Sequence, residues 1–209
     1  MRNTIINRRF KYTDVNATSI LIIINVVVFI LQNIFTDLPY ILSMVPVYIR
    51  LKHWYWQFFT YMFSHVDFWH LFSNMLGLFI FGRIVERSVG SREFLLYYLL
   101  TGTLAGITSY FLYLYSGSIF TVVLGASGAL YAIMLLFSVL FPNAVVYVFG
   151  IIPMRAPILV ILYFFIDFFG QLKADGTAHL VHLSGLLFGI LYITIRMKIN
   201  PLKQWGIMK

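Results

Sequence analysis

The sequence contains no cysteine and few charged residues. Without cysteine among its 209 residues, the chain can form neither a disulfide framework nor a thiolate metal site. Charged residues account for 11% of the chain and hydrophobic residues for 61%, whereas an ordinary soluble domain carries about 25% charged residues. This composition indicates an integral membrane protein.

Other absent patterns argue against several classes of membrane protein. The chain has no H-E-x-x-H sequence, which a membrane zinc protease should show. An aspartyl intramembrane protease needs two aspartates at membrane depth, and Asp167 is the only candidate. We expect Asp167 and Asp175 to be solvated or interfacial. A small transporter would typically show repeat symmetry or helices broken at mid-membrane, and the sequence shows neither.

Several apolar runs reach the roughly 20 residues that cross a hydrocarbon core. They predict an all-α, polytopic membrane protein with a bundle of six transmembrane helices. The first run follows a basic segment but is too long for a signal peptide and lacks a cleavage site, so we expect an uncleaved helix. The six expected spans are Ala17–Phe35, Phe68–Ile84, Phe94–Tyr115, Gly125–Phe141, Ala156–Leu172 and Gly176–Ile195.

Two connections between the spans are unusual. Residues 36–67 contain two prolines and the aromatic group Trp54-Tyr55-Trp56, which favours the headgroup level of a bilayer. We expect an ordered interfacial loop there. Residues 143–155 are rich in valine, and their periodicity fits either a short interfacial strand or a continued helix. The expected organisation is an N-terminal segment 1–16, a membrane domain 17–197 and a C-terminal tail 198–209.

The positive charges predict the orientation of this bundle. The formal net charge of +8 does not indicate a nucleic-acid partner, because the basic residues flank apolar runs, as the positive-inside rule requires. With the N-terminus inside, the outer segments hold three of the fifteen basic residues, Arg50, Lys52 and Lys173. The inner segments hold the other twelve: Arg2, Arg8, Arg9, Lys11, Arg83, Arg87, Arg92, Arg155, Arg196, Lys198, Lys203 and Lys209. Both termini should face the cytoplasm.

Polar residues recur near the outer ends of the second, fourth and sixth spans. They are His70 and Asn74, Ser127, and His179 and His182. Polar residues at membrane depth are candidates for function. A serine hydroxyl becomes a nucleophile when a histidine accepts its proton, and amide or imidazole donors can stabilise the resulting oxyanion. Hydrogen bonding between helices is the alternative for His70 and Asn74, and a structural role is the alternative for His179.

Small residues cluster in the same spans. Gly125-Ala126-Ser127-Gly128 taken alone is most simply a helix-packing sequence. Gly128 with Ala129 on the fourth span, and Gly185 with Gly189 on the sixth, would let the two helices approach closely. We expect Gly125 to contribute to the same contact.

Three motifs together resemble the rhomboid family of intramembrane serine proteases, over about residues 17–197. The first is His70-x-x-x-Asn74 and the second is the Gly125–Gly128 quartet. The third is the run 178–185, Ala-His-Leu-Val-His-Leu-Ser-Gly. Their joint occurrence in the expected helices is specific, although each motif alone is not.

The resemblance implies a role for each site residue. Ser127 would be the nucleophile and His182 the base, as a dyad with no acidic third member. His182 is chosen over His179 because Gly185 and Gly189 follow it at the family's spacing. His70, Asn74 and the Ser127 backbone N–H would form the oxyanion hole. Three further features are compared with the family pattern: Tyr131, which would pack on the base; Glu86-Arg87 with Gly90, which match a structural motif; and Trp56-Gln57, where the family usually has Trp-Arg.

The implied activity is that of an intramembrane serine endopeptidase without a metal or other cofactor. Its partners would be the lipid bilayer and transmembrane protein substrates, cleaved near the outer face of the cell membrane. The interfacial loop and the aromatic fifth span are the expected flanks of the substrate route. The alternatives are a non-catalytic rhomboid-like membrane chaperone, which would lack the serine or the histidine, and a small transporter.

Overall fold

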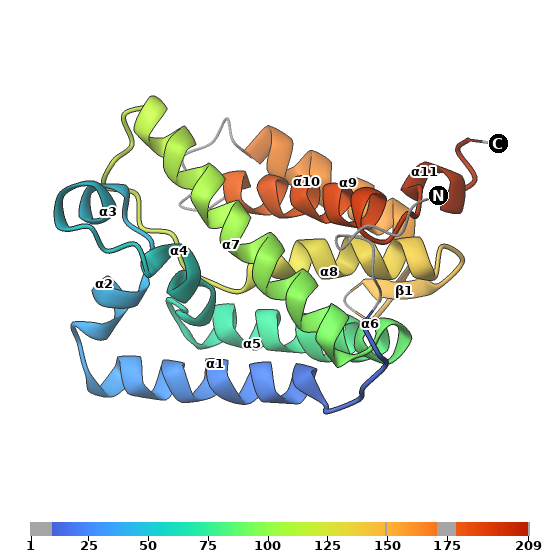
Figure 1. The fold of residues 1–209 in the computed structure, drawn as a ribbon, viewed down its shortest axis with the longest axis horizontal. Coiled ribbons are helices and arrows are strands. Elements are labelled where there is room, and N and C mark those ends of the chain that lie inside the picture. Colours follow the sequence, from blue (N-terminus) through green and yellow to red (C-terminus); the bar gives the residue numbers. More distant parts are fainter. Residues whose placement is uncertain (1–9, 149, 171–178, 209) are drawn as a thin grey trace.

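The computed structural model describes residues 10–148, 150–170 and 179–208. The described chain is mostly helical, as the sequence predicts (Figure 1). The expected positions Arg2, Arg8, Arg9, Leu172, Lys173, Asp175, Gly176, Ala178 and Lys209 lie outside the described residues. The long helices are α1 (Ala17–Ile34), α5 (Phe68–Gly77), α6 (Arg83–Val89), α7 (Ser91–Tyr115), α8 (Ser127–Leu140), α9 (Ala156–Gly170) and α10 (His179–Ile195).

Three of the expected spans are long and apolar enough to cross a membrane. They are α1, the continuous segment Phe68–Val89 and α7. The segment Phe68–Val89 joins α5 to α6 through a π-helical turn, η3 (Leu78–Gly82). The remaining expected spans are apolar helices of 14, 15 and 17 residues as described. The structure therefore supports a helical membrane protein with three candidate crossings, and six crossings stay a prediction.

The described structure corrects three boundaries and resolves one alternative. The second span continues past Ile84 to Val89. The fourth span begins at Ser127 and not at Gly125, because Gly125 has φ +111°, which no α-helix accommodates. The third begins at Ser91, three residues before the expected Phe94. The valine-rich segment is an antiparallel hairpin of β1 (Val145–Val148) and β2 (Ile152–Arg155), with Val145 paired to Arg155.

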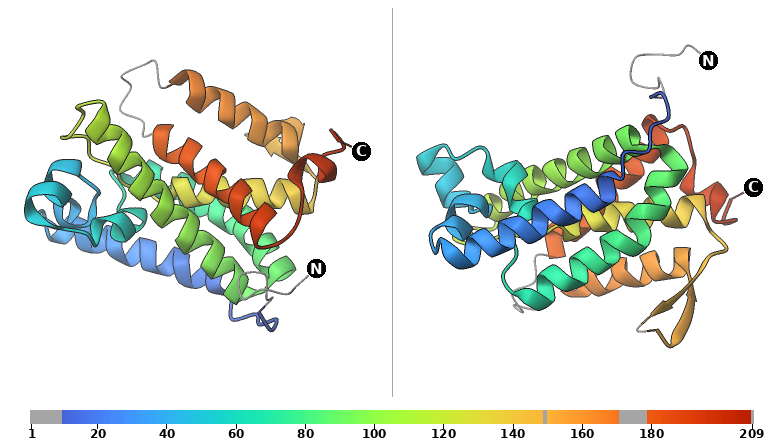
Figure 2. Two further views of the ribbon diagram at one scale, coloured as in Figure 1. Left: turned by 45° about the horizontal axis from the view of Figure 1, so that its top comes forward. Right: turned by 90° about the horizontal axis from the view of Figure 1, so that it is seen from below.

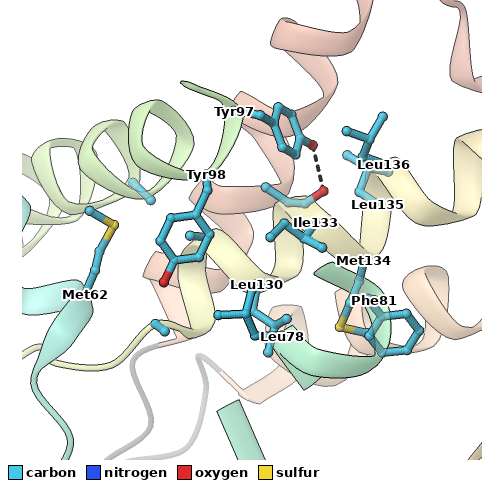
Figure 3. Packing of buried hydrophobic residues seen from close by; sticks show 14 of the residues in the cluster. Met62, Leu78, Phe81, Tyr97, Tyr98, Leu130, Ile133, Met134, Leu135 and Leu136 are labelled. Atoms are coloured by element: carbon cyan, nitrogen blue, oxygen red, sulfur yellow. Dashed lines mark hydrogen bonds between the residues drawn. The ribbon is translucent and has the colours of Figure 1, made fainter. Parts of the chain in front are cut away.

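Helix α8 occupies the centre of the bundle. Its buried Leu130, Ile133 and Leu136 pack against side chains from the surrounding helices, as Figure 3 shows. The hydroxyl of Tyr97 on α7 donates to the carbonyl of Ala132 at 2.6 Å. A buried, apolar helix of this kind can present polar groups only at its ends, and Ser127 lies at its N-terminal end.

Glycines bring α8 and α10 into backbone contact. A Cβ built on Gly185 would lie 2.0 Å from the Gly128 carbonyl oxygen, and one built on Gly128 would lie 2.7 Å from Val181 Cγ1. Gly189 continues the contact beside Ala132 and Tyr97. This geometry agrees with the close approach of the two helices that these glycines predict. Gly125, in contrast, packs against the His70 ring and not against α10.

Glu86 anchors the start of α1. Its fully buried carboxylate accepts hydrogen bonds from the backbone N–H groups of Ala17 and Thr18, at 2.6 and 3.0 Å. The hydroxyls of Thr18 and Ser91 also donate to it. The first N–H groups of a helix have no partner within the helix, so this carboxylate acts as a remote cap. Gly90, with φ +86°, turns the chain into α7 next to it.

The segment between α1 and α5 is ordered and lies at one end of the bundle (Figure 1). It forms α2 (Leu38–Leu42), α3 (Pro46–Lys52), α4 (Gln57–Thr60) and the 3-10 turn η2 (Tyr61–Phe63). Gln57, which stands where the resemblance leads one to expect arginine, is buried and cross-links this segment. Its amide nitrogen donates to the Tyr40 carbonyl at 2.9 Å, and its amide oxygen accepts from Val45 N–H at 3.1 Å.

The opposite end of the bundle carries the short helix α11 (Pro201–Gln204) and the start of α1. The indole of Trp205 donates to the Ser138 carbonyl at 3.2 Å, which docks the C-terminal segment on α8. Helix α9 lies at the periphery beside α10, as both views in Figure 2 show, and the hairpin leads into it.

Candidate active site

A short extended segment precedes Ser127 and is hydrogen-bonded at two points to the segment between α1 and α5. Met44 and Val123 exchange backbone hydrogen bonds of 2.8 and 2.9 Å. The N–H of Gly125 donates to the Tyr61 carbonyl at 2.9 Å. Because Gly125 then turns the chain with a positive φ, α8 begins immediately at Ser127. The serine thus lies where unpaired N–H groups and the positive end of the helix dipole favour an anion.

The side chains of Ser127 and His182 are in hydrogen-bond contact. Ser127 Oγ lies 2.7 Å from His182 Nε2, although 55 residues separate them in the sequence. The Gly128–Gly185 contact makes this distance possible, because a larger residue there would push α8 and α10 apart. The sequence expectation that these two residues meet agrees with the geometry.

Tyr131 holds the face of the His182 ring. The two rings are stacked, with centroids 4.3 Å apart and an interplanar angle of 16°. Tyr163 on α9 packs edge-on against Tyr131, at 5.6 Å between centroids. Tyr131 lies one helical turn after Ser127, so one face of α8 supplies both the hydroxyl and the support for the imidazole.

Asp167 on α9 is the part of the site that the sequence interpretation placed wrongly. It is not solvated, because its side chain is 2% exposed. Its Oδ1 lies 2.9 Å from His182 Nδ1 and 2.6 Å from His179 Nδ1. The expectation of a dyad without an acidic third member therefore does not describe this arrangement. An acidic residue inside an apolar helix was the available signal, since such residues seldom occur in spans without a role.

The expected oxyanion residues occupy the neighbouring end of α5. The His70 ring lies against the Gly125 backbone, where a Cβ would come within 2.8 Å of Nε2. Asn74 is buried, and its amide nitrogen donates to the His70 carbonyl at 2.8 Å. One of its two amide hydrogens is therefore used within α5, and the second is left for another acceptor. The backbone N–H of Ser127 lies at the first turn of α8.

His65 also belongs to this neighbourhood, and the sequence analysis did not single it out. Its ring is buried and packs edge-on against His70, with centroids 5.1 Å apart. Burial, with the nearby His70, lowers the pKa of His65 to about 3. The neutral ring accepts a hydrogen bond from Ala126 N–H at 3.4 Å. His65 thereby supports the backbone next to Ser127, and only its tertiary contacts identify it.

The donor types of a metal site are present in one cluster. Within the described residues, Asp167, His179 and His182 each offer a ligand atom, all within 4.8 Å of one another. Asp167 on α9 joins the two histidines of α10, a position that the sequence alone did not reveal. The Oδ1 atom of Asp167 lies at hydrogen-bond distance from the Nδ1 atoms of both histidines.

Comparisons with known proteins agree with these motifs. Residues 52–199 match the Rhomboid domain family. The chain is 37% identical over 139 residues to "RHOMBOID-like protein 12, mitochondrial" of Arabidopsis thaliana, which covers 58% of this chain and 41% of that protein. It is 30% identical over 115 residues to "Rhomboid protease GlpG" of Klebsiella pneumoniae, covering 54% and 40%. A third relative is "Rhomboid protein 1, mitochondrial" of Saccharomyces cerevisiae, 32% identical over 133 residues, covering 62% and 38%.

The aligned region spans about two fifths of the length of each of these relatives.

Proposed function

The chain belongs to the rhomboid family, and from this premise we propose that it is an intramembrane serine endopeptidase. Its substrates are transmembrane segments of membrane proteins, cleaved near the outer face of the membrane. Ser127 acts as the nucleophile and His182 as the general base. The observation that carries the proposal is the 2.7 Å separation between Ser127 Oγ and His182 Nε2.

The acylation step follows from this pair. Ser127 Oγ attacks the carbonyl carbon of the scissile peptide bond while His182 Nε2 takes its proton, because a serine hydroxyl is a weak nucleophile until a base is adjacent. The imidazolium then gives that proton to the leaving amine, and the peptide bond breaks. Water later attacks the acyl-enzyme through the same base, and Ser127 is regenerated.

Three donors are proposed for the oxyanion that forms during the attack. They are the backbone N–H of Ser127, the side chain of His70 and the second amide hydrogen of Asn74. Each such donor typically contributes about 2.7–4 kcal/mol to the stabilisation of the transition state. The N-terminal position of Ser127 on α8 supports this assignment, since a helix N-terminus favours developing negative charge.

The substrate route is proposed to pass between the interfacial segment and α9. A peptide bond in a helix is shielded, so the substrate segment must unwind to reach Ser127. Helix α9 turns half-exposed aromatic rings outward, which suits contact with lipid or with a transmembrane segment; these are Phe164, Phe165, Phe168 and Phe169. Cross-linking a substrate only to α1 or α7 would contradict this route.

Two rival functions predict different features. A non-catalytic rhomboid-like chaperone would need neither a serine nor a histidine, yet both are present and in contact. A transporter would need a path at mid-membrane, whereas the polar side chains of the proposed site lie at the N-terminal ends of α5, α8 and α10. We further propose that residues 17–197 form the membrane domain and that both termini are cytoplasmic.

The test is cleavage of a reporter transmembrane substrate by purified protein in liposomes. Ser127→Ala and His182→Ala should each lower kcat by several orders of magnitude, because nucleophile and base act as one unit. The melting temperature of Ser127→Ala should stay close to that of the wild type, whereas that of His182→Ala should fall, because the buried Asp167 carboxylate loses one of its two imidazole partners. A serine-directed fluorophosphonate should label the wild type and not Ser127→Ala. Full activity in Ser127→Ala would refute the mechanism.

A further inference from the structure

Asp167 lies in an apolar helix, and the proposed dyad mechanism assigns it no role. Its neighbours in sequence on α9 are Ile166 and Phe168, both half-exposed, whereas Asp167 itself points inward and is 2% exposed. Taking a carboxylate out of water costs several kcal/mol unless other groups compensate for it. Two imidazole rings supply that compensation here, from His179 and His182 on α10.

The contacts define which nitrogen of His182 carries the proton. An ionised carboxylate only accepts hydrogen bonds, so each Nδ1 at 2.6 and 2.9 Å from Asp167 Oδ1 must bear a hydrogen. In a neutral imidazole the other nitrogen is then unprotonated. For His182 this is Nε2, the atom that lies 2.7 Å from Ser127 Oγ. The carboxylate therefore selects the tautomer that can accept the serine proton.

The same contact stabilises the charge that catalysis creates. When His182 accepts the serine proton, its ring becomes an imidazolium with Nδ1–H still directed at Asp167. Charge-assisted hydrogen bonds are about twice as strong as neutral ones, so this bond strengthens as the oxyanion forms. Tyr131, stacked at 4.3 Å, fixes the plane of the ring, and Asp167 fixes its rotation within that plane.

The distances separate this role from a metal site. Two ligands on a tetrahedral zinc ion with bonds of 2.0–2.2 Å lie about 3.3–3.6 Å apart. The Asp167 Oδ1 atom is nearer than that to both Nδ1 atoms, at 2.6 and 2.9 Å, which are hydrogen-bond lengths. The distances therefore fit hydrogen bonds between the carboxylate and the two imidazole rings, and they are too short for ligands of one zinc ion.

We propose that Asp167 is a positioning residue, which holds His182 in the tautomer and orientation that its role as base requires. This inference rests on the proposed protease function. It changes the expected dyad into an arrangement in which a carboxylate from α9 stands behind the base. His179 shares the carboxylate and holds it in place.

The first experiment compares substitutions at Asp167 by their kinetic constants. Asp167→Asn keeps the size of the side chain but offers an NH2 group that favours the wrong tautomer, so kcat should fall about 100-fold or more. KM should change by less than about threefold, because the substrate does not touch this residue. Asp167→Glu keeps the carboxylate and should retain more activity than Asp167→Asn. A role in packing alone predicts the opposite order.

A matched control comes from another buried acid. Glu93 on α7 bonds to Arg196 Nε at 2.6 Å and to the Tyr192 hydroxyl, at the far end of α10 from His182. Glu93→Gln should lower the melting temperature and leave kcat within about threefold of the wild type. If Glu93→Gln and Asp167→Asn lose kcat equally, the proposed positioning role is wrong.

The second experiment reads the protonation of His182 directly in the wild type and does not measure activity. Nitrogen-15 NMR of histidine-labelled wild type in lipid reports which ring nitrogen is protonated, and the signals missing from His182→Gln identify His182. The proposal expects Nδ1–H at the pH of activity, and an Nε2–H tautomer would overturn it. An active Ser127→Ala variant would refute the protease mechanism, and the spectrum would still show whether Nδ1 of His182 carries the proton that the contact with Asp167 requires. If only Asp167→Asn kept full kcat, the positioning role alone would fail.

Also expected is insensitivity to chelators. Treatment with EDTA should leave the kcat of the wild type unchanged, because the cluster works through protons. Inactivation by EDTA with recovery on adding Zn²⁺ would contradict the positioning role and favour a metal site made of the same three residues.

Discussion

Single polar residues in this bundle work by contacting one another across helices. Ser127 on α8, His182 on α10 and Asp167 on α9 form one continuous chain of hydrogen bonds. Each of them would be costly in an apolar environment without its partner. Neighbouring groups in this chain lie 2.7–2.9 Å apart, which is hydrogen-bond distance. These hydrogen bonds offset the free-energy cost of burying the polar groups, and they are the same contacts that catalysis would use.

His65 should make the protein sensitive to acid. Its pKa is lowered to about 3 by burial and by the nearby His70, whereas in an unfolded chain it is about 6.5. Between these values the unfolded state binds the extra proton. The free energy of unfolding should therefore fall as the pH drops from about 6.5 towards 3, by up to about 1.4 kcal/mol per pH unit.

The measurement is the melting temperature in detergent between about pH 7 and pH 4, where this histidine contributes most of its linkage. His65→Gln removes the titrating group, so its melting temperature should depend less on pH than that of the wild type. His53→Asn, at an exposed histidine, is the control and should keep the wild-type dependence. An unchanged slope in His65→Gln would show that other groups cause the acid sensitivity.

Between elements, the α8–α10 contact determines whether the site exists. Gly185→Ala would place a Cβ 2.0 Å from the Gly128 carbonyl oxygen, and a backbone atom cannot rotate away. The two helices must separate, which lengthens the distance between Ser127 Oγ and His182 Nε2. We expect cleavage to fall at least about tenfold, since small displacements of reacting groups are costly, with a lower melting temperature.

Gly189→Ala is the comparison on the same face of α10. Its Cβ would meet the Tyr97 hydroxyl at 2.8 Å and a Leu135 methyl group at 3.0 Å, which are side-chain atoms that can shift. Gly189→Ala should therefore retain more activity than Gly185→Ala in the same reporter assay. Equal activity of the two variants would show that the backbone contact does not control the site.

Helix α9 has two functions in these proposals. Its outward aromatic face borders the proposed substrate route, and its inward Asp167 contacts the base. A movement of α9 that admits substrate would therefore also move the carboxylate behind His182. The access of substrate and the orientation of the His182 ring would then both depend on the position of α9.

For the whole molecule, the two ends of the bundle differ in their contents. The segment between α1 and α5 lies at one end and is hydrogen-bonded to the residues just before Ser127, whereas α11 and the start of α1 lie at the other end (Figure 1). Twelve of the fifteen basic residues fall in segments expected to be inside. The outer end would then hold the site, where water can reach an acyl-enzyme.

The absence of cysteine makes this orientation testable. Lys52→Cys on α3 and Lys203→Cys on α11 each introduce a single thiol at an exposed position. A membrane-impermeant maleimide should label the Lys52→Cys protein in intact cells. It should label the Lys203→Cys protein only after permeabilisation. Reversed labelling would invert the proposed topology and place the site at the cytoplasmic face.

Much of the fold and part of the site could be predicted from the sequence, for local reasons. Long apolar runs specify helices in a membrane because backbone groups there must bond within the segment. The resemblance that the motifs carry implied that Ser127, His182 and Tyr131 belong to one site, and the glycines indicated a close contact between the two helices. Each motif is a short run of residues, so it can be recognised in the sequence before the packing is known, although Ser127 and His182 themselves lie 55 residues apart.

The tertiary structure decided what lies behind the base and what supports the serine. Asp167 sits near the end of an apolar helix, and its sequence neighbours do not say whether it faces water, lipid or another helix. That depends on how α9 is rotated about its axis against α10, which packing across the whole bundle sets. Packing across the bundle likewise decides that His65 and Gln57 are buried. The sequence by itself determined the apolar helices, and the resemblance of its motifs predicted the serine–histidine pair; the packing of the helices determined the carboxylate that accompanies the pair.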